Sequence, residues 1–342
     1  MLFTQCIGID ISKVSFTACY CYQDSSGHQT YSEVKIFKNE KTGFNQLLRW
    51  VRKISDTKAP LVFLMEATGV YYERLAHHLA KIKMQVCVVL PNTSKHYFSS
   101  LNIKTKTGAV DAKVLSRFGV ERTHKLWIPP KKSLLELRNL TRYYVQLQEQ
   151  KTALNNIKHS KESSERVQAL ILQSNNRLIA QLDKQIEIII EQIKWLIQKD
   201  KELQSKVEKL ISIKGVGLMT VAIVIAETLG FEHVKSCKQL VSYAGYDVVQ
   251  RESGTSIKGK TRISKKGNRY IRKAMYFPAM VASRTNETMK DNYLRIIKNK
   301  PSKMIGQVAI QRKLLILMYT LWKNDSLYNP NYKMEVAQKA SF

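Results

Sequence analysis

The sequence predicts an α/β domain followed by a mainly helical region, and three observations support this prediction. Short β-rich runs alternate with helical stretches over roughly the first 125 residues. Beyond Pro129-Pro130 the apolar residues follow a helical period for about 80 residues. A glycine-containing turn and another apolar helical stretch then begin a third region. The 342 residues are therefore expected to form two or three domains, each with its own core.

The amino-terminal domain shows the pattern of a mixed sheet. Its predicted elements are strands over Cys6–Ile11, Phe16–Tyr22 and Ser32–Phe37, a helix over Phe44–Ile54, a strand ending at Glu66, a helix over Tyr71–Ile82, a strand over Gln85–Leu90 closed by Pro91-Asn92, and a helix starting near Ala109. A three-stranded meander followed by alternating helices and strands indicates a ribonuclease H type of sheet rather than an all-parallel one. This fold places Asp10 on the central first strand and Glu66 on its neighbour.

The middle region is predicted to form one long helix with an apolar seam. Its members recur at spacings of three, four and seven, with polar residues between them: Leu178, Leu182, Ile186, Ile189, Ile193, Leu196, Leu203, Val207 and Leu210. An earlier helix with its own apolar positions is expected to pair with this seam across the polar segment His159–Glu165. A helical hairpin within one chain and a coiled coil between chains fit this pattern about equally well.

The charge of the chain points to a polyanionic partner. The formal net charge is +29, from 56 Lys and Arg against 27 Asp and Glu, which favours nucleic acid as the partner. A membrane surface is the alternative, but no apolar run has the length of a spanning helix, and the first residues lack the pattern of a signal peptide. A cytoplasmic protein without membrane contact is therefore expected. The five cysteines show no zinc-ligand spacing.

Acidic residues occur at positions suited to metal binding. Asp10 ends the apolar run Ile7-Gly8-Ile9, Glu66 ends a second apolar run, and Asp111 lies near the start of a helix. Each alone is compatible with a turn or cap role. Because Mg²⁺ prefers carboxylate oxygens and keeps several waters, a few convergent carboxylates suffice to hold it against a phosphate. The set therefore predicts a magnesium site for phosphodiester chemistry.

A second candidate site lies in the most basic stretch. Ser253 is a candidate nucleophile, because neighbouring cations can position a phosphate and stabilise the charge that develops during attack. A simple Ser-Gly turn on a passive basic face is the alternative. The turn at Gly215 and Gly217 is expected to offer backbone N–H groups to a phosphate near a helix amino terminus. The cations predicted to contact phosphate are Arg251, Lys258, Lys260, Arg262, Lys265, Lys266, Arg269 and Arg272.

Together these motifs resemble the DEDD-type transposases of bacterial insertion sequences, a family that includes the pilin-gene invertases. The matching residues occur in the same order along nearly the whole chain: Asp10, Glu66-Ala67-Thr68-Gly69, Lys106-Thr107 with Asp111-Ala112, Gly215-Val216-Gly217, Ser253-Gly254, and Ser264-Lys265-Lys266-Gly267-Asn268-Arg269 with Arg272. The resemblance implies a RuvC-like domain over 1–127, a helical coiled-coil linker over 128–208, a transposase domain with a helix-hairpin-helix element over 209–325, and a tail over 326–342.

The resemblance also implies a mechanism. Ser253 would form a covalent phosphoserine link to DNA, assisted by Mg²⁺ at Asp10, Glu66 and Asp111. A structured bridge RNA would pair with the target and donor DNA, and the chain would act as a dimer or tetramer. Three alternatives remain open: a metal-dependent nuclease of the Holliday-junction type, a DNA invertase, and a basic nucleic-acid-binding protein with impaired catalysis.

One position departs from the family motif. The family pattern is Lys-Thr-Asp-x-x-Asp-Ala, whereas this chain reads Lys106-Thr107-Gly108-Ala109-Val110-Asp111-Ala112. Acids three residues apart on a helix share one face, so both could reach the metal in the family pattern. Because glycine supplies no ligand, we expect reduced activity. The open alternatives are that the remaining three carboxylates suffice and that this stretch is altered in this copy.

Overall fold

The computed structural model describes residues 4–232, 234–250, 252–254, 256–259, 261–300 and 302–331. The chain divides into two compact units, Met1–Pro129 and Pro130–Phe342, and each unit is described by itself. Within the described residues, no helix combines the length and the apolar character needed to cross a membrane.

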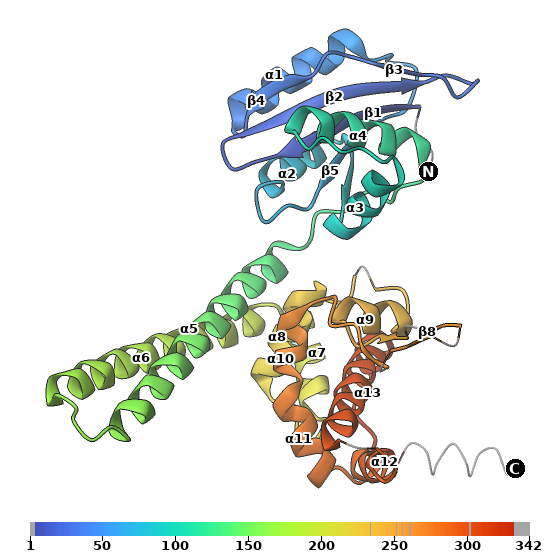
Figure 1. The fold of residues 1–342 in the computed structure, drawn as a ribbon. Coiled ribbons are helices and arrows are strands. Elements are labelled where there is room, and N and C mark those ends of the chain that lie inside the picture. Colours follow the sequence, from blue (N-terminus) through green and yellow to red (C-terminus); the bar gives the residue numbers. More distant parts are fainter. Residues whose placement is uncertain are drawn as a thin grey trace, which may run out of the picture. The chain divides into compact units, whose positions relative to one another are not determined.

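The amino-terminal unit is built on a six-stranded mixed sheet (Figure 1). Its strands are β1 (Gln5–Ile11), β2 (Ser15–Gln23), β3 (Gln29–Tyr31), β4 (Lys35–Lys38), β5 (Leu61–Glu66) and β6 (Gln85–Val89). Strand β2 pairs antiparallel with β1, β3 and β4, whereas β5 pairs parallel with both β1 and β6. The strand order β3-β2-β1-β5-β6, with β4 also beside β2, places β1 at the centre. The predicted mixed sheet with Asp10 on its central strand is confirmed.

The predicted third strand is two short strands. The prediction of one strand over Ser32–Phe37 is wrong, because β3 ends at Tyr31 and β4 begins at Lys35. The Ser32 hydroxyl accepts a hydrogen bond from the Tyr20 N–H at 3.0 Å, while the Ser32 N–H donates to the Tyr20 carbonyl at 3.0 Å. A side-chain oxygen thus replaces a backbone carbonyl in the ladder, which separates the two strands.

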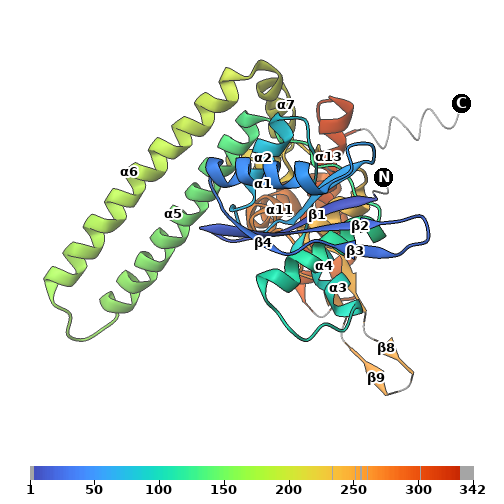
Figure 2. The ribbon, with the colours of Figure 1, turned by 90° about the horizontal axis from the view of Figure 1, so that it is seen from above.

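Helices cover both faces of this sheet (Figure 2). They are α1 (Lys41–Ile54), α2 (Glu73–Lys81), α3 (Pro91–Ser100) and α4 (Gly108–Glu121). The alternation of β1 sends Ile7 and Ile9 toward the core under α1 and α2, and Cys6 toward the core under α3 and α4. Helix α3 was not predicted: Pro91 begins this helix instead of merely closing the preceding strand, as proline at a first helical position can.

Gly8 lets α4 lie directly on the central strand. A Cβ atom built on Gly8 would lie 2.0 Å from the Ser116 nitrogen and 2.3 Å from the Ala112 carbonyl oxygen. Both atoms belong to the backbone of α4, so no side-chain rotation could relieve the overlap. The absence of a side chain at Gly8 therefore sets how closely the start of α4, with Asp111, approaches the end of β1.

Replacement of Gly8 by alanine is expected to lower the free energy of unfolding by about 1–3 kcal/mol, the usual cost of forcing an extra carbon into a packed interior. Denaturant titration monitored by circular dichroism measures this change. An unchanged denaturation midpoint would show that α4 does not press on β1 at this residue.

The carboxy-terminal unit is mainly helical. Its helices are α5 (Lys132–Glu162), α6 (Ala169–Lys199), α7 (Lys201–Ile211), α8 (Leu218–Thr228), α9 (Cys237–Ala244), α10 (Arg269–Ala274), α11 (Tyr276–Thr285), α12 (Glu287–Ile297) and α13 (Lys303–Asn324). Two short antiparallel strand pairs accompany them: β7 (Val248–Val249) with β10 (Arg262–Ile263), and β8 (Glu252–Ser253) with β9 (Ile257–Lys258). One continuous apolar core joins helices from α5 to α13.

Helices α5 and α6 lie side by side as a hairpin within the chain (Figures 1 and 2). The Asn175 side chain of α6 donates to the Leu154 carbonyl of α5 at 2.9 Å. The predicted seam is interrupted at Asp200, which ends α6 and caps α7 by accepting a hydrogen bond from the Leu203 N–H at 3.1 Å. The prediction of one unbroken helix is therefore wrong, and Leu178 of the seam is 46% exposed. A coiled coil between chains remains a prediction.

The predicted glycine turn joins α7 to α8. Gly215 has φ +93°, a conformation that favours glycine, and a Cβ atom at this residue would lie 3.1 Å from the Ala282 nitrogen of α11. Gly217 begins α8 as its N-cap residue, with open space around the position of a Cβ. The turn thus lies between α7 and α8 and packs against α11, which fixes the amino terminus of α8.

Candidate catalytic and nucleic-acid-binding site

The amino-terminal carboxylates occupy one edge of the sheet. Because β1 and β5 are parallel neighbours, with Ile9 opposite Met65, their carboxyl ends bring Asp10 and Glu66 to the same edge. Asp111 lies in the first turn of α4, the helix that packs on β1. All three acidic residues are partly exposed. The sheet and the helix thus bring together the acidic residues that the sequence predicted.

The charges of these carboxylates influence one another. Burial raises the pKa of Asp10, the negative charges of Asp111 and Glu66 raise it further, and Lys106 opposes the shift. Burial also raises the pKa of Asp111, where Lys106 again opposes the shift and Glu66 adds to it. Bringing like charges together in a partly desolvated place costs free energy, which a bound cation would offset.

The carboxylate oxygens at this edge are the type of ligand that hard cations prefer. Asp111 Oδ1 is buried, and no hydrogen-bond partner for it occurs among the described residues. Glu66 Oε2 already accepts a hydrogen bond from the Ser94 hydroxyl at 2.7 Å. Within the described part of the chain, no group of three or more His, Cys, Asp or Glu side chains is gathered closely enough to hold a metal ion. These carboxylates are thus of the chemical kind that binds hard cations, but they are not drawn together around a single point.

A side chain at Gly108 would lie in tight contact with Asp10 and Thr17. A Cβ atom at Gly108 would lie 3.0 Å from Asp10 Oδ2 and 3.2 Å from the Thr17 hydroxyl. Gly108 is the first residue of α4, and Thr107 caps this helix by accepting a hydrogen bond from the Val110 N–H at 3.2 Å. An aspartate at this position would therefore add a carboxylate next to Asp10.

We expect Gly108→Asp to increase recombination and divalent-cation affinity at least about tenfold, a typical effect of groups that support a metal site. Gly108→Asn is the matched control, because it adds a side chain of the same size without a charge. Recombination assays and cation titrations followed by thermal unfolding provide the measurements. Equal activity of Gly108→Asp and the unchanged chain would show that the missing carboxylate does not limit the reaction.

Asp10 is expected to destabilise the metal-free fold at neutral pH. Since folding raises its pKa, the stabilising contribution of neutral Asp10 is complete below the unfolded pKa of about 3.9 and is lost as pH rises through the folded pKa. Asp10→Asn should therefore raise Tm at pH 7 in the presence of a chelator, and its advantage should shrink as pH falls toward the unfolded pKa of about 3.9.

The matched control for this pH dependence is Asp24→Asn. Hydrogen bonding from Ser26 lowers the pKa of Asp24, so its replacement should not raise Tm. A pH-independent gain from Asp10→Asn would contradict the electrostatic account.

Ser253 lies on an exposed hairpin of the carboxy-terminal unit. It pairs with Ile257 between β8 and β9, and Gly254 follows with φ +54°. Figure 2 shows this hairpin projecting from the helices of its unit. Arg251 and Lys260 lie outside the described residues, and so does the side chain of Lys258, although its backbone belongs to β9. The hairpin therefore presents the Ser253 side chain to solvent.

The remaining predicted phosphate contacts lie between Arg262 and Arg272. The side chains of Arg262, Lys265, Lys266 and Arg269 are exposed. Arg272 differs, because its Nη1 donates to the Ala244 carbonyl at 2.7 Å at the end of α9. Residues Ser264–Arg272 are called the basic segment below. This segment combines exposed cations with one arginine, Arg272, that bonds to the backbone of its own chain.

Sequence reasoning missed Gly8 and Glu227. The close packing of Gly8 on α4 has no local signal, since glycine in a strand also marks bulges. Glu227 is buried on α8 and accepts hydrogen bonds from Arg142 and Asn268. A single acid in the apolar stretch Leu218–Thr228 was a visible signal, because an acid is rarely buried without a partner.

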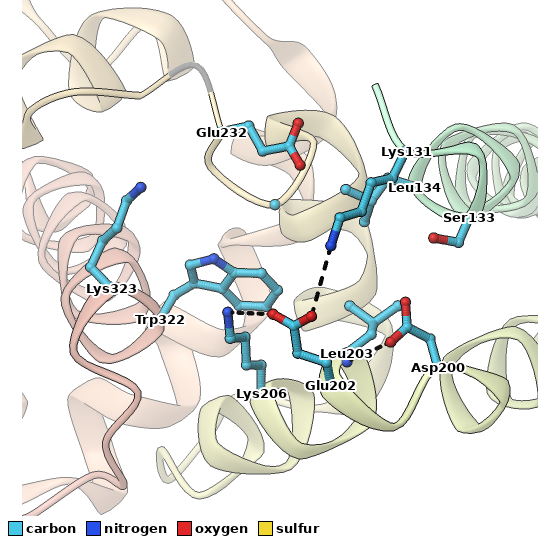
Figure 3. A pocket seen from close by; sticks show the side chains of 11 residues that line it. Lys131, Ser133, Leu134, Asp200, Glu202, Leu203, Lys206, Glu232, Trp322 and Lys323 are labelled. Carbon is cyan, nitrogen blue, oxygen red and sulfur yellow. Dashed lines mark hydrogen bonds and ion pairs between the residues drawn. The ribbon is translucent and has the colours of Figure 1, made fainter. Parts of the chain in front are cut away.

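A cavity of about 280 Å³ lies elsewhere in the carboxy-terminal unit (Figure 3). Lys131 and Lys206 both pair with Glu202, at 3.8 Å and 3.1 Å. Lys206 also lies over the ring of Trp322, 5.1 Å from its centroid. None of the predicted site residues lines this cavity, and its positive charges are matched by acids, so it offers no reason to bind a polyanion.

Two transposase family models match the chain. One, a DEDD-type model described as "Transposase", matches residues 7–160, and the other, "Transposase IS116/IS110/IS902 family", matches residues 207–294. The pilin gene-inverting protein of Moraxella bovis is 29% identical over 321 residues, which cover 93% of this chain and 96% of that protein. The protein of the same name from Moraxella lacunata is 29% identical over 324 residues, with the same coverage.

Among solved structures, a Thermus thermophilus RuvC structure matches with a TM-score of 0.28 and 10% identity, covering 36% of this chain and 99% of that one. T. thermophilus RuvC in complex with a Holliday junction substrate matches with a TM-score of 0.26 and 9% identity at the same coverage. The two matched transposase regions and the full-length relatives define the class as a DNA transposase or recombinase. The chain belongs to the DEDD-type transposase and recombinase family.

Proposed function

We propose that this enzyme cleaves and rejoins DNA at the ends of an insertion sequence through a covalent link to Ser253, assisted by Mg²⁺ at Asp10, Glu66 and Asp111. The observation that carries this proposal is that acidic residues from β1, β5 and α4 lie near enough to one another for the charges of Asp111 and Glu66 to raise the pKa of Asp10. The exposure of Ser253 and of the cations Lys265, Lys266 and Arg269 supports the assignment of the nucleophile.

The covalent step conserves the energy of the phosphodiester bond. The Ser253 Oγ attacks phosphorus, and a new Oγ–P bond forms as the bond from phosphorus to a deoxyribose oxygen breaks. The serine proton leaves to a base, and the departing deoxyribose oxygen is released as a hydroxyl. Attack by another deoxyribose hydroxyl reverses the step and releases the serine, so rejoining needs no nucleotide cofactor.

Each group has a distinct role in this proposal. Arg262, Lys265, Lys266 and Arg269 hold DNA phosphates, with Gly215 and Gly217 offering backbone N–H groups to a further phosphate. Arg251, Lys258 and Lys260 are proposed contacts from sequence. Asp10, Glu66 and Asp111 hold the cation, which when bound neutralises charge on the reacting phosphate.

A bridge RNA and self-association complete the proposal. The net charge of +29 suits a chain that binds RNA as well as DNA. Between α5 and α6 an apolar groove includes Tyr143 and Leu178, each 46% exposed, and a second copy of the hairpin would cover it. Light scattering of the purified chain tests this association, and a monomeric mass counts against it.

Incubation of the chain with a supercoiled plasmid that carries the element ends tests the proposed chemistry. We expect rejoined products and a protein–DNA adduct that resists detergent. A metal-dependent nuclease would instead yield nicked or cut DNA without an adduct, and an impaired binding protein would yield only a salt-sensitive complex.

DNA inversion is the second candidate reaction, favoured by the two full-length relatives named for pilin gene inversion. It uses the same residues and differs in the arrangement of the DNA ends. A plasmid with a segment between inverted sites separates the reactions, because inversion reorients the segment whereas transposition moves it.

A further inference from the structure

Glu227 is the one acid of the apolar helix α8, and its side chain is 1% exposed. Arg142 of α5 donates to it through two hydrogen bonds, from Nε to Oε1 at 2.6 Å and from Nη2 to Oε2 at 2.9 Å. This paired geometry fixes the carboxylate in one orientation. Replacing a buried ion pair by apolar residues is often neutral or stabilising, so stability alone does not account for this acid.

The same carboxylate holds the basic segment. Asn268 Nδ2 donates to Glu227 Oε2 at 2.5 Å. The other end of the amide, Asn268 Oδ1, accepts from the N–H groups of Tyr270 and Ile271 at 2.9 Å and 3.1 Å, and thus caps α10. One side chain therefore connects the buried acid to the start of the helix that carries Arg269.

The backbone on either side of Asn268 is also fixed. The Asn268 N–H donates to the Tyr243 carbonyl at 2.7 Å, and the Tyr243 hydroxyl donates to the Glu227 carbonyl at 2.8 Å. A Cβ atom on Gly267 would lie 2.5 Å from the Tyr243 carbonyl oxygen, so the segment is pressed against the end of α9. The exposed cations Lys265, Lys266 and Arg269 thus project from a backbone held from within.

We propose that Glu227 is a positioning residue that acts through Asn268 to hold the basic segment in the orientation that binds DNA phosphates. This inference rests on the proposed function only in taking the basic segment as a DNA contact. Preorganising these cations spares the complex the cost of ordering them on binding.

Asn268→Asp tests the connection with little other change. Aspartate caps a helix as well as asparagine does, so α10 keeps its cap, but the donor to Glu227 is lost and two carboxylates face each other. We expect duplex-DNA affinity to fall at least about tenfold, the equivalent of losing a hydrogen bond to a charged group. Amide hydrogen exchange within residues 264–272 should become faster, and Tm should change less than in Arg142→Ala.

The double variant Glu227→Gln with Asn268→Asp reverses the polarity of the same hydrogen bond. The glutamine amide can donate to the aspartate, and the net charge of the pair is unchanged, but Arg142 Nη2 loses its acceptor at the former Oε2 position. Affinity and exchange should therefore recover part of the loss. Glu149→Gln is the matched control: Glu149 also contacts α10, through Lys273 at 2.9 Å, but its side chain is 46% exposed and its loss should leave affinity unchanged.

Asn268→Ser is a second test that remains available if Asn268→Asp does not fold. Serine keeps a capping oxygen, adds no charge and is too short to reach Glu227. Duplex-DNA affinity should therefore fall in this variant too, but by less than in Asn268→Asp. Wild-type exchange and affinity in either Asn268 variant, or a folded double variant without recovery, would overturn the positioning role. Wild-type DNA affinity of Arg269→Ala would instead overturn the assignment of the basic segment to DNA, and with it that part of the proposed function.

Discussion

Ser253→Ala is expected to reduce both adduct formation and recombination on the order of 10³-fold or more, since removal of a covalent nucleophile abolishes the pathway it opens. Binding of duplex DNA should be unchanged, because the substitution removes no charge. Gel analysis of detergent-resistant adducts and a plasmid recombination assay provide the measurements.

Ser256→Ala is the control for this experiment, because Ser256 is an exposed serine between β8 and β9 of the same hairpin. It should keep full activity. An adduct that persists in Ser253→Ala, or one that disappears in Ser256→Ala, would show that the nucleophile is not Ser253.

Arg142→Ala is expected to cause the largest loss of stability. It leaves the Glu227 carboxylate, 1% exposed, without the guanidinium that pairs with both of its oxygens. Removing one partner of a buried ion pair typically costs 3–5 kcal/mol. We expect about 3 kcal/mol, because the Arg142 side chain is 38% exposed and water can enter the space it leaves.

Denaturant titration of Arg142→Ala measures this loss. The matched control is Lys273→Ala, which removes the exposed ion pair to Glu149 and should cost no more than about 1 kcal/mol. Similar losses of unfolding free energy in the two variants would mean that the buried Arg142–Glu227 pair stabilises the fold no more than the exposed pair does.

Much of the amino-terminal site could be predicted because its signals are local. Asp10 and Glu66 end apolar runs, and adjacent parallel strands place such ends at one edge. The pairing of β1 with β5 also explains why residues far apart in sequence meet there. The close approach of α4 to Gly8 could not be predicted, because it depends on backbone atoms from a distant helix.

Elsewhere the local sequence pattern gave a wrong prediction or no prediction. Helix α3 is largely polar, so hydrophobic periodicity gave no signal for it. The apolar seam continues past Asp200, but the capping bond to Leu203 ends one helix and begins another. The bond between Glu227 and Asn268 joins residues that are 41 apart and has no sequence pattern. Arg272 shows the same difficulty, because its bond to Ala244 depends on the fold.

Peptide mapping of the trapped adduct tests the central claim most directly. The chain is incubated with DNA that carries the element ends, denatured, and digested with protease and nuclease, and the residue that retains a nucleotide is located by mass spectrometry. We predict a phosphodiester linkage at Ser253. A linkage at any other residue, or strand cleavage without a linked residue, would contradict the account.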